Sequence, residues 1–163
     1  MNIFFAVIVG ILASFCVMLF SYKYYVRKNF FLALSRFLDE IELNLSFLKD
    51  DLHKLTKNFS SNSLKFDDVL KAYESFLDTS NNAEFETKIL SFTFLNDDEK
   101  QKVLDYFKKL GRSDCSTQND LTKAMQKYVL EKMDVCKSDV SKKANLVQKL
   151  SVIFGLFVII LLV

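Results

Sequence analysis

Proline is absent from this 163-residue chain, which has only three glycines, no tryptophan and one histidine. Proline and glycine form the tight turns of β-hairpins, so their scarcity argues against an all-β fold. Because neither residue lies between Gly10 and Gly111, long helices can run without interruption. The single histidine, His53, has no second histidine with which to form a metal cluster or triad, and we interpret it as a surface residue.

Charge is absent from both ends of the chain. All 22 Lys and Arg and all 20 Asp and Glu lie between Lys23 and Lys149. A charged block between two apolar ends is the layout of a membrane protein. The net charge of +2 is too small to predict a nucleic-acid partner.

The three cysteines, Cys16, Cys115 and Cys136, follow neither a metal-ligand spacing nor a disulfide framework. We interpret them as reduced thiols in a cytosolic setting. Helix starts lower thiol pKa, so Cys115 could be reactive, but an ordinary turn residue is the favoured interpretation. The acidic run DDE at 97–99 does not follow the spacing of a Ca²⁺ loop, and we assign it to the first turn of a helix.

The first 22 residues carry no charge and would rise roughly 33 Å as a helix, against a hydrocarbon core of about 30 Å. They are therefore predicted to form a transmembrane helix. Lys23, Arg27 and Lys28 follow the span, which places the N-terminus outside and the charged block in the cytoplasm. A cleavable signal peptide would carry its cations before the apolar run instead.

The chain ends on LSVIFGLFVIILLV, and counting from Leu146 gives eighteen residues that rise about 27 Å, with Lys149 snorkelling towards the headgroups. Residues 146–163 are therefore predicted to form a second transmembrane helix. Lys142 and Lys143 precede it, so both termini are expected outside. The alternative, a buried core helix of a soluble protein, is disfavoured because a helix that is apolar on every face would need a larger protein around it.

The residues between these spans, 23–145, are predicted to form a cytosolic helical-bundle domain. Apolar side chains recur every three or four residues in five segments: 30–59, 66–77, 85–95, 103–110 and 121–147. Residues 92–94 alternate like a strand, but a lone strand would have no partner, so we expect a helix there. Asn96 is expected to cap the next helix. The fold class is therefore all-α, a bundle of about five helices whose first and last helices extend into the membrane.

One turn carries a resemblance to a known family. The stretch LGRSDCSTQNDL, residues 110–121, resembles the Leu-Gly-x-x-Asp-x-x-x-Gln turn of the stage III sporulation protein AB family of endospore-forming bacteria. The order of parts is also similar, down to the glycine-containing apolar tail KLSVIFGLFVIILLV.

The four matching residues each have a structural interpretation. Leu110 would close one helix on the core, and Gly111 would supply a left-handed C′ position. Asp114 would cap the next helix, and Gln118 would hydrogen-bond back to the turn. We interpret these residues as fold determinants, with direct contact to a partner as the alternative.

The resemblance implies a domain similar to the cytoplasmic domains of type II secretion and type IV pilus inner-membrane platform proteins. It implies a non-enzymatic scaffold in the transenvelope channel between mother cell and forespore, on the mother-cell side of the outer forespore membrane. The implied partners are the secretion-type ATPase, stage III sporulation protein AA, and other membrane components of that channel. No catalytic residue, metal, cofactor or small-molecule substrate is expected.

Three other interpretations are open. A platform protein of an ordinary secretion or pilus system would have longer, repeated domains and more membrane helices, whereas this chain has room for one domain only. A membrane enzyme or redox sensor would use Cys115 or Cys136. A two-anchor tether would bind anionic lipid through the lysines of the last helix.

Overall fold

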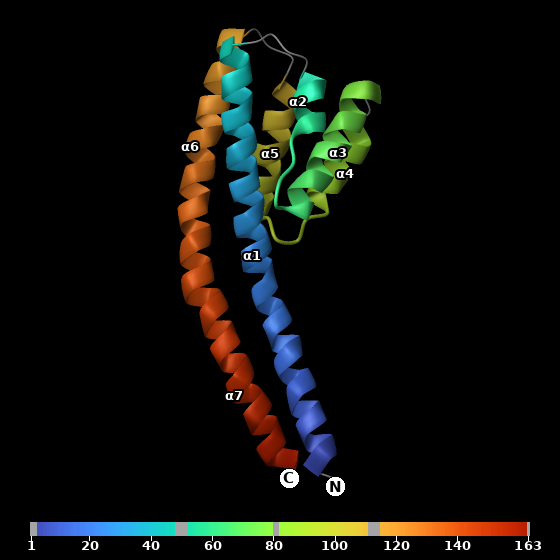
Figure 1. Cartoon of the computed structure of the whole chain (residues 1–163), viewed down its shortest axis with the longest axis vertical. Coiled ribbons are helices and arrows are strands. Elements are labelled where there is room, and N and C mark those ends of the chain that lie inside the picture. The colour runs from blue at the N-terminus through green and yellow to red at the C-terminus, as the bar shows by residue number, and fades with distance from the viewer. Residues whose placement is uncertain (1–2, 48–51, 80–81, 111–114, 163) are drawn as a thin grey trace. The chain divides into compact units, whose positions relative to one another are not determined.

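The computed structural model describes residues 3–47, 52–79, 82–110 and 115–162, and Figure 1 shows their helices in chain order. The helices are α1 (Ile3–Phe47), α2 (Leu52–Asn58), α3 (Leu64–Thr79), α4 (Asn82–Leu90), α5 (Asp97–Lys109), α6 (Cys115–Asp139), the π-helix η1 (Val140–Ala144) and α7 (Asn145–Leu162). These described residues contain no strand, which confirms the all-α prediction. With α6, η1 and α7 counted as one segment, the described ranges hold six helical segments rather than about five.

The additional segment is α2, because the stripe from Phe30 to Phe59 is divided between two helices and ends at Phe59, the residue just after α2. On a single helix, Phe37 and Phe59 would be separated by roughly 33 Å at 1.5 Å per residue. Their ring centroids lie 5.2 Å apart in an edge-to-face contact. The residue that follows α2 therefore packs against α1, and Phe59 belongs to the same aromatic core as Phe37.

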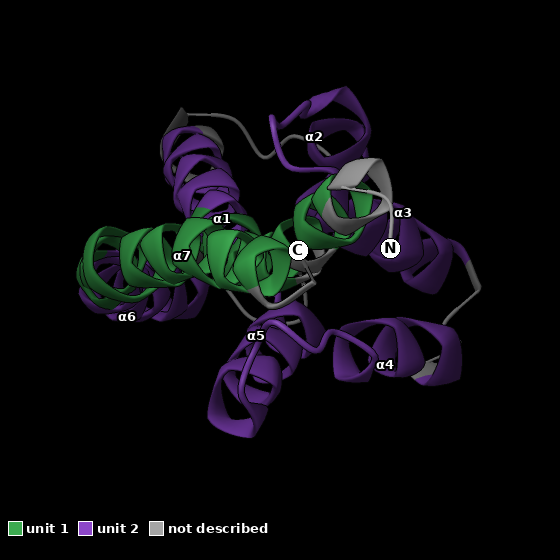
Figure 2. Ribbon diagram, turned by 90° about the horizontal axis from the view of Figure 1, so that it is seen from below, with its two compact units in different colours: residues 1–28, 134–163 green, residues 29–133 purple. Residues whose placement is uncertain are grey.

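The chain divides into two compact units, coloured separately in Figure 2. Unit 1 consists of residues 1–28 and 134–163, and unit 2 consists of residues 29–133. Unit 1 therefore takes the first part of α1 together with the end of α6, η1 and α7. Unit 2 takes the rest of α1, helices α2 to α5 and most of α6.

Unit 2 is built around aromatic side chains. The fully buried ones are Phe30, Phe31, Phe37, Phe66, Tyr73, Phe85 and Phe107. The Phe37 ring lies 5.6 Å from that of Phe66 on α3 and 5.9 Å from that of Phe107 on α5. Such pairs contribute about 0.5–1.5 kcal/mol each beyond the area they bury. Phe37 thus joins α1 to three other parts of unit 2.

Helix α4 ends at Leu90, earlier than the sequence pattern predicts. The expected helix over 85–95 is therefore correct only for its first part, and residues 91–96 form a turn. Phe92 and Leu95 are buried in this turn, and the Phe92 ring lies 6.1 Å from that of Phe30. Burial of both side chains leads the chain out of the helix and into the core.

Helix α5 begins with the cap that the sequence predicts. The Asn96 side chain accepts a hydrogen bond from the Glu99 backbone N–H at 2.9 Å, and the Glu99 carboxylate accepts one from the Asn96 N–H at 3.1 Å. This reciprocal pair is a capping box. The Glu99 side chain is fully buried, and Lys132 Nζ lies 3.8 Å from its second oxygen. Asp97, Asp98 and Glu99 thus belong to a helix start, as expected.

Replacing Asn96 by alanine is expected to destabilise unit 2 by about 1 kcal/mol, because the N–H of Glu99 loses its acceptor. Urea unfolding of the full chain in detergent, followed by circular dichroism, measures the change. The control is Gln101→Ala on the exposed face of the same helix, which should change stability by less than about 0.5 kcal/mol. Equal effects of the two substitutions would contradict a stabilising role for the cap.

Candidate functional site

Unit 1 is an antiparallel pair of helices that touch through small residues. A Cβ atom added to Gly10 would lie 2.9 Å from the carbonyl oxygen of Gly155, and one added to Gly155 would lie 2.9 Å from the carbonyl oxygen of Gly10. The same positions overlap the side chains of Ile159 and Ser14. Ser14 Oγ donates to the Ser151 carbonyl oxygen at 2.9 Å. The two backbones can approach this closely only because both glycines lack side chains.

This crossing is the feature that the sequence analysis missed. Gly10 and Ser14 form a small-x-x-x-small pair, and Ser151 and Gly155 form another, which is the usual interface of two helices in a membrane. Lipid tails are as apolar as leucine, so helices in lipid associate through close packing and hydrogen bonds instead of apolar burial. The spacing of these four residues was the signal that could have revealed the contact.

The π-helix η1 keeps one face of the last helix buried along unit 1. Cys136, Ala144, Ser151 and Gly155 are buried. A regular α-helix from Cys136 to Gly155 would make roughly 5.3 turns and rotate Gly155 about 100° away from that face. A π-helix, with its i→i+5 hydrogen bonds, winds more slowly and removes most of this rotation. The face that begins at Cys136 therefore still contains Gly155.

The charged end of unit 1 is closed by an ion pair between its two helices. Arg27 Nη1 donates to Asp139 Oδ2 at 3.0 Å, and both side chains are mostly buried. Lys143 Nζ lies 2.6 Å from the other oxygen of Asp139. The hydrogen bond to Asp139, and then its negative charge, raise the pKa of Lys143. Closer to the chain ends, the Gln148 side chain donates to the Tyr25 hydroxyl at 3.4 Å.

Two helical stretches, Val7–Leu43 and Ser116–Ile160, are long and apolar enough to cross a membrane. Only 12% and 17% of their most apolar windows are buried within the chain. A core helix of a soluble protein would be mostly buried, so this exposure argues against that alternative. The exposed side chains include Ile11, Phe15 and Phe20 on α1 and Phe154 and Ile160 on α7.

Two of the four residues of the family turn lie in the described part of the chain, and both are buried. Leu110 is the C-cap of α5, and its N–H donates to the Tyr106 carbonyl oxygen at 3.0 Å. Gln118 is buried near the start of α6. Gly111 and Asp114 lie outside the described residues. The predicted structural roles of the four residues stay predictions.

Hydrogen bonds on both sides of this turn connect it to the core of unit 2. The Tyr73 hydroxyl donates to the Leu110 carbonyl oxygen at 3.2 Å. The hydroxyls of Tyr106 and Thr122 lie 3.3 Å apart and link α5 to α6. Burial raises the pKa of the Tyr106 phenol, while the hydrogen bond with Thr122 opposes that effect. Tyr106 therefore stays neutral beside the turn.

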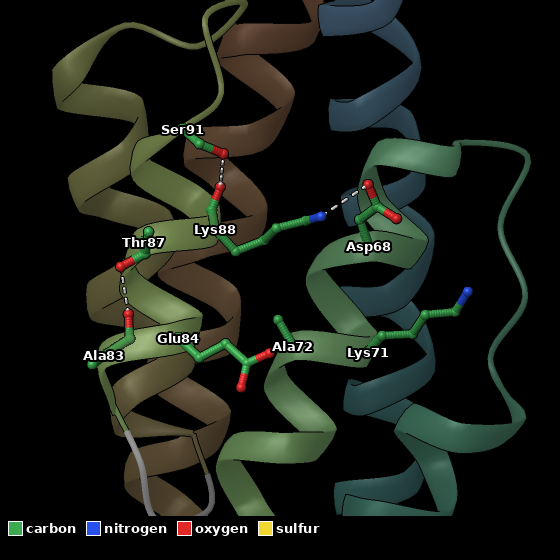
Figure 3. A pocket seen from close by; sticks show the side chains of 8 residues that line it. All are labelled: Asp68, Lys71, Ala72, Ala83, Glu84, Thr87, Lys88 and Ser91. Atoms are coloured by element: carbon green, nitrogen blue, oxygen red, sulfur yellow. Dashed lines mark hydrogen bonds and ion pairs between the residues drawn. The ribbon is translucent and has the colours of Figure 1, made fainter.

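A groove of about 600 Å³ runs between α3 and α4 in unit 2 (Figure 3). Its lining combines small, hydroxyl and charged side chains: Asp68, Lys71, Ala72, Ala83, Glu84, Thr87, Lys88 and Ser91. Lys88 reaches from α4 to Asp68 on α3, with the two groups 3.3 Å apart. The hydroxyls of Thr87 and Ser91 donate to carbonyl oxygens of their own helix. The groove is thus lined by charged side chains, while the hydroxyls of Thr87 and Ser91 are engaged in backbone hydrogen bonds.

The other candidate residues lie apart from one another. His53 faces the carboxylates of Glu74 and Asp78 on α3 at 3.7 and 3.8 Å. Cys136 is buried in unit 1 and forms no disulfide. Cys115 begins α6, but the side chains of Cys115 and Cys16 lie outside the described set. Within the described residues, no group of three His, Cys, Asp or Glu side chains is placed to hold a metal ion.

A family model for stage III sporulation protein AB matches residues 2–163. The chain belongs to this family. The match covers both apolar ends, unit 2 and the turn at 110–121, so it confirms the resemblance and associates the chain with sporulation. No curated protein and no solved structure matches the chain.

Replacing Gly155 by leucine is expected to separate the two helices of unit 1, because the new side chain would overlap Ser14 and the Gly10 backbone. Overpacking of this kind costs about 1–3 kcal/mol. The assay is disulfide formation between Ser14→Cys and Ser151→Cys in a chain whose native cysteines are alanine. Gly155→Leu should reduce its yield about tenfold or more.

Val152→Leu is the matched control, since Val152 is exposed one turn away on the same helix. It should leave the yield unchanged. Efficient cross-linking in the Gly155→Leu chain would contradict the close crossing.

Proposed function

We propose that this member of the stage III sporulation protein AB family is a non-enzymatic membrane scaffold of the sporulation channel between mother cell and forespore. Unit 1 anchors the chain in the outer forespore membrane through two transmembrane helices. Unit 2 lies in the mother-cell cytoplasm with both termini on the other side of the membrane. There unit 2 docks the secretion-type ATPase, stage III sporulation protein AA, to the membrane components of the channel.

The observation that carries the proposal is the full-length family match on a chain whose two units differ in surface chemistry. Unit 1 exposes large apolar side chains along both of its helices, as a pair of lipid-facing helices does. Unit 2 has an aromatic core and a charged surface, as a domain in water does. A scaffold needs this combination and needs no reaction of its own.

The positions of the cations support the orientation. Lys23, Arg27 and Lys28 follow the first apolar stretch, and Lys142 and Lys143 precede the last one. Cytoplasmic loops carry an excess of Lys and Arg next to membrane spans. Both ends therefore favour a cytoplasmic unit 2.

Co-purification of the full chain with the ATPase, in mild detergent, tests the proposal. Phe37→Ala should abolish co-purification, because losing the buried ring destabilises unit 2 by about 3–5 kcal/mol. The control is Leu12→Ala, which truncates an exposed side chain of unit 1 and should leave binding unchanged.

Two results would contradict this role. One is the absence of binding to the ATPase while other channel components co-purify well. The other is equal binding by the parent chain and by a Phe37→Ala chain that circular dichroism shows to be unfolded in unit 2.

A further inference from the structure

The two units carry net charges of opposite sign. Unit 1 contains seven Lys and Arg and only two Asp, for a net charge of +5. Unit 2 contains fifteen Lys and Arg and eighteen Asp and Glu, for a net charge of −3. The small net charge of the whole chain is therefore the sum of a strongly cationic unit and an acidic one.

The cations of unit 1 gather at one end of the helix pair. The contacts Ser14 to Ser151 and Arg27 to Asp139 fix an antiparallel register in which Lys23 lies level with Lys142 and Lys143. Lys149 lies about 10 Å further along its helix. Its side chain leans back towards the other lysines, because Cβ atoms point to the N-terminus of a helix.

We call this group the basic collar: Lys23, Lys28, Lys142, Lys143 and Lys149. Four of its members are exposed, and Lys28 is partly exposed. The tyrosines beside it mark the depth of a membrane interface, where aromatic residues with a polar tip are enriched. Tyr22 is 66% exposed, and the Lys23 ammonium lies 5.3 Å from the ring centre of Tyr24.

Few acidic groups can neutralise the collar from within unit 1. Its two acids are Asp134 and Asp139. Asp134 pairs with Lys137 at 3.2 Å, and Asp139 is shared by Arg27 and Lys143. Among the described residues, Lys28, Lys142 and Lys149 make no ion pair within 4 Å. The collar thus keeps a net positive charge that calls for an anionic partner.

We propose that the basic collar binds the headgroups of anionic phospholipids in the cytoplasmic leaflet. This inference rests on the membrane anchoring in the proposed function. Each Lys or Arg held near an anionic leaflet strengthens the attraction, and the effect fades beyond a Debye length. An acidic peptide could supply carboxylates, but a phospholipid also supplies acyl chains for the exposed apolar side chains directly below the collar.

The experiment uses the full chain in phosphatidylcholine vesicles that contain a trace of spin-labelled phosphatidylglycerol or spin-labelled phosphatidylcholine. The fraction of each label that is motionally restricted, measured by electron paramagnetic resonance, gives the preference for the anionic lipid. The parent chain should prefer phosphatidylglycerol by about tenfold, and 1 M NaCl should remove most of that preference.

The test variant is the triple substitution Lys23→Gln, Lys142→Gln and Lys149→Gln, which spares the ion pairs of Asp139. It should lose most of the preference. The control is Lys109→Gln, Lys123→Gln and Lys127→Gln, which removes the same charge from exposed positions of unit 2 and should keep it. Equal preferences in the two variants, or no preference in the parent chain, would overturn the proposal.

Two further measurements identify the ligand and separate this inference from the anchoring. Inorganic phosphate should reduce the preference no more than chloride at the same ionic strength, and a larger effect of phosphate would overturn the assignment to lipid. Alkaline carbonate should leave all three chains in the vesicles. Release of the parent chain would contradict the anchoring itself, whereas retention without a lipid preference would overturn only the collar.

Discussion

The structure depends on the backbone hydrogen bonds of helix α1. An α-helix makes these bonds within its own segment, so they are satisfied in lipid and in water alike. The same helix can therefore serve two environments along its length. In unit 1 it exposes Ile11, Phe15 and Leu19, and in unit 2 it buries Phe30, Leu34 and Phe37. The last helical run, from α6 through η1 to α7, behaves in the same way. Absence of proline and scarcity of glycine are what permit both runs.

Each unit is stabilised internally by a different kind of interaction. In unit 2, aromatic rings from α1, α3, α4 and α5 bury apolar surface away from water, and Phe37 and Phe107 connect most of them. In unit 1, contact relies on close approach at Gly10 and Gly155 and on the Ser14 hydrogen bond. A substitution that enlarges a side chain is therefore tolerated worst at Gly10 or Gly155 in unit 1, and one that removes a ring is tolerated worst in the core of unit 2.

Much of the fold was predictable because its signals are local. Spacing of apolar residues predicts most helices, and Asn96 with Glu99 three residues later predicts the start of α5. The separate helix α2 was not predictable, since the contact of Phe59 with Phe37 joins positions distant in sequence. The end of α4 depends likewise on Phe92 reaching Phe30. Of the candidate site, the cations at Lys23, Lys142 and Lys149 were visible in sequence. The sequence did not show that these lysines gather at one end of the helix pair, because this follows from the register of the two helices.

The most direct test of the central claim is the accessibility of single cysteines to a membrane-impermeant maleimide in intact vegetative bacteria. The central claim is that unit 1 spans the membrane with unit 2 in the cytoplasm. In a cysteine-free chain, Asn2→Cys and Val163→Cys should react in intact cells, and Lys109→Cys should react only after the membrane is permeabilised. Labelling of Lys109→Cys in intact cells would contradict the claim.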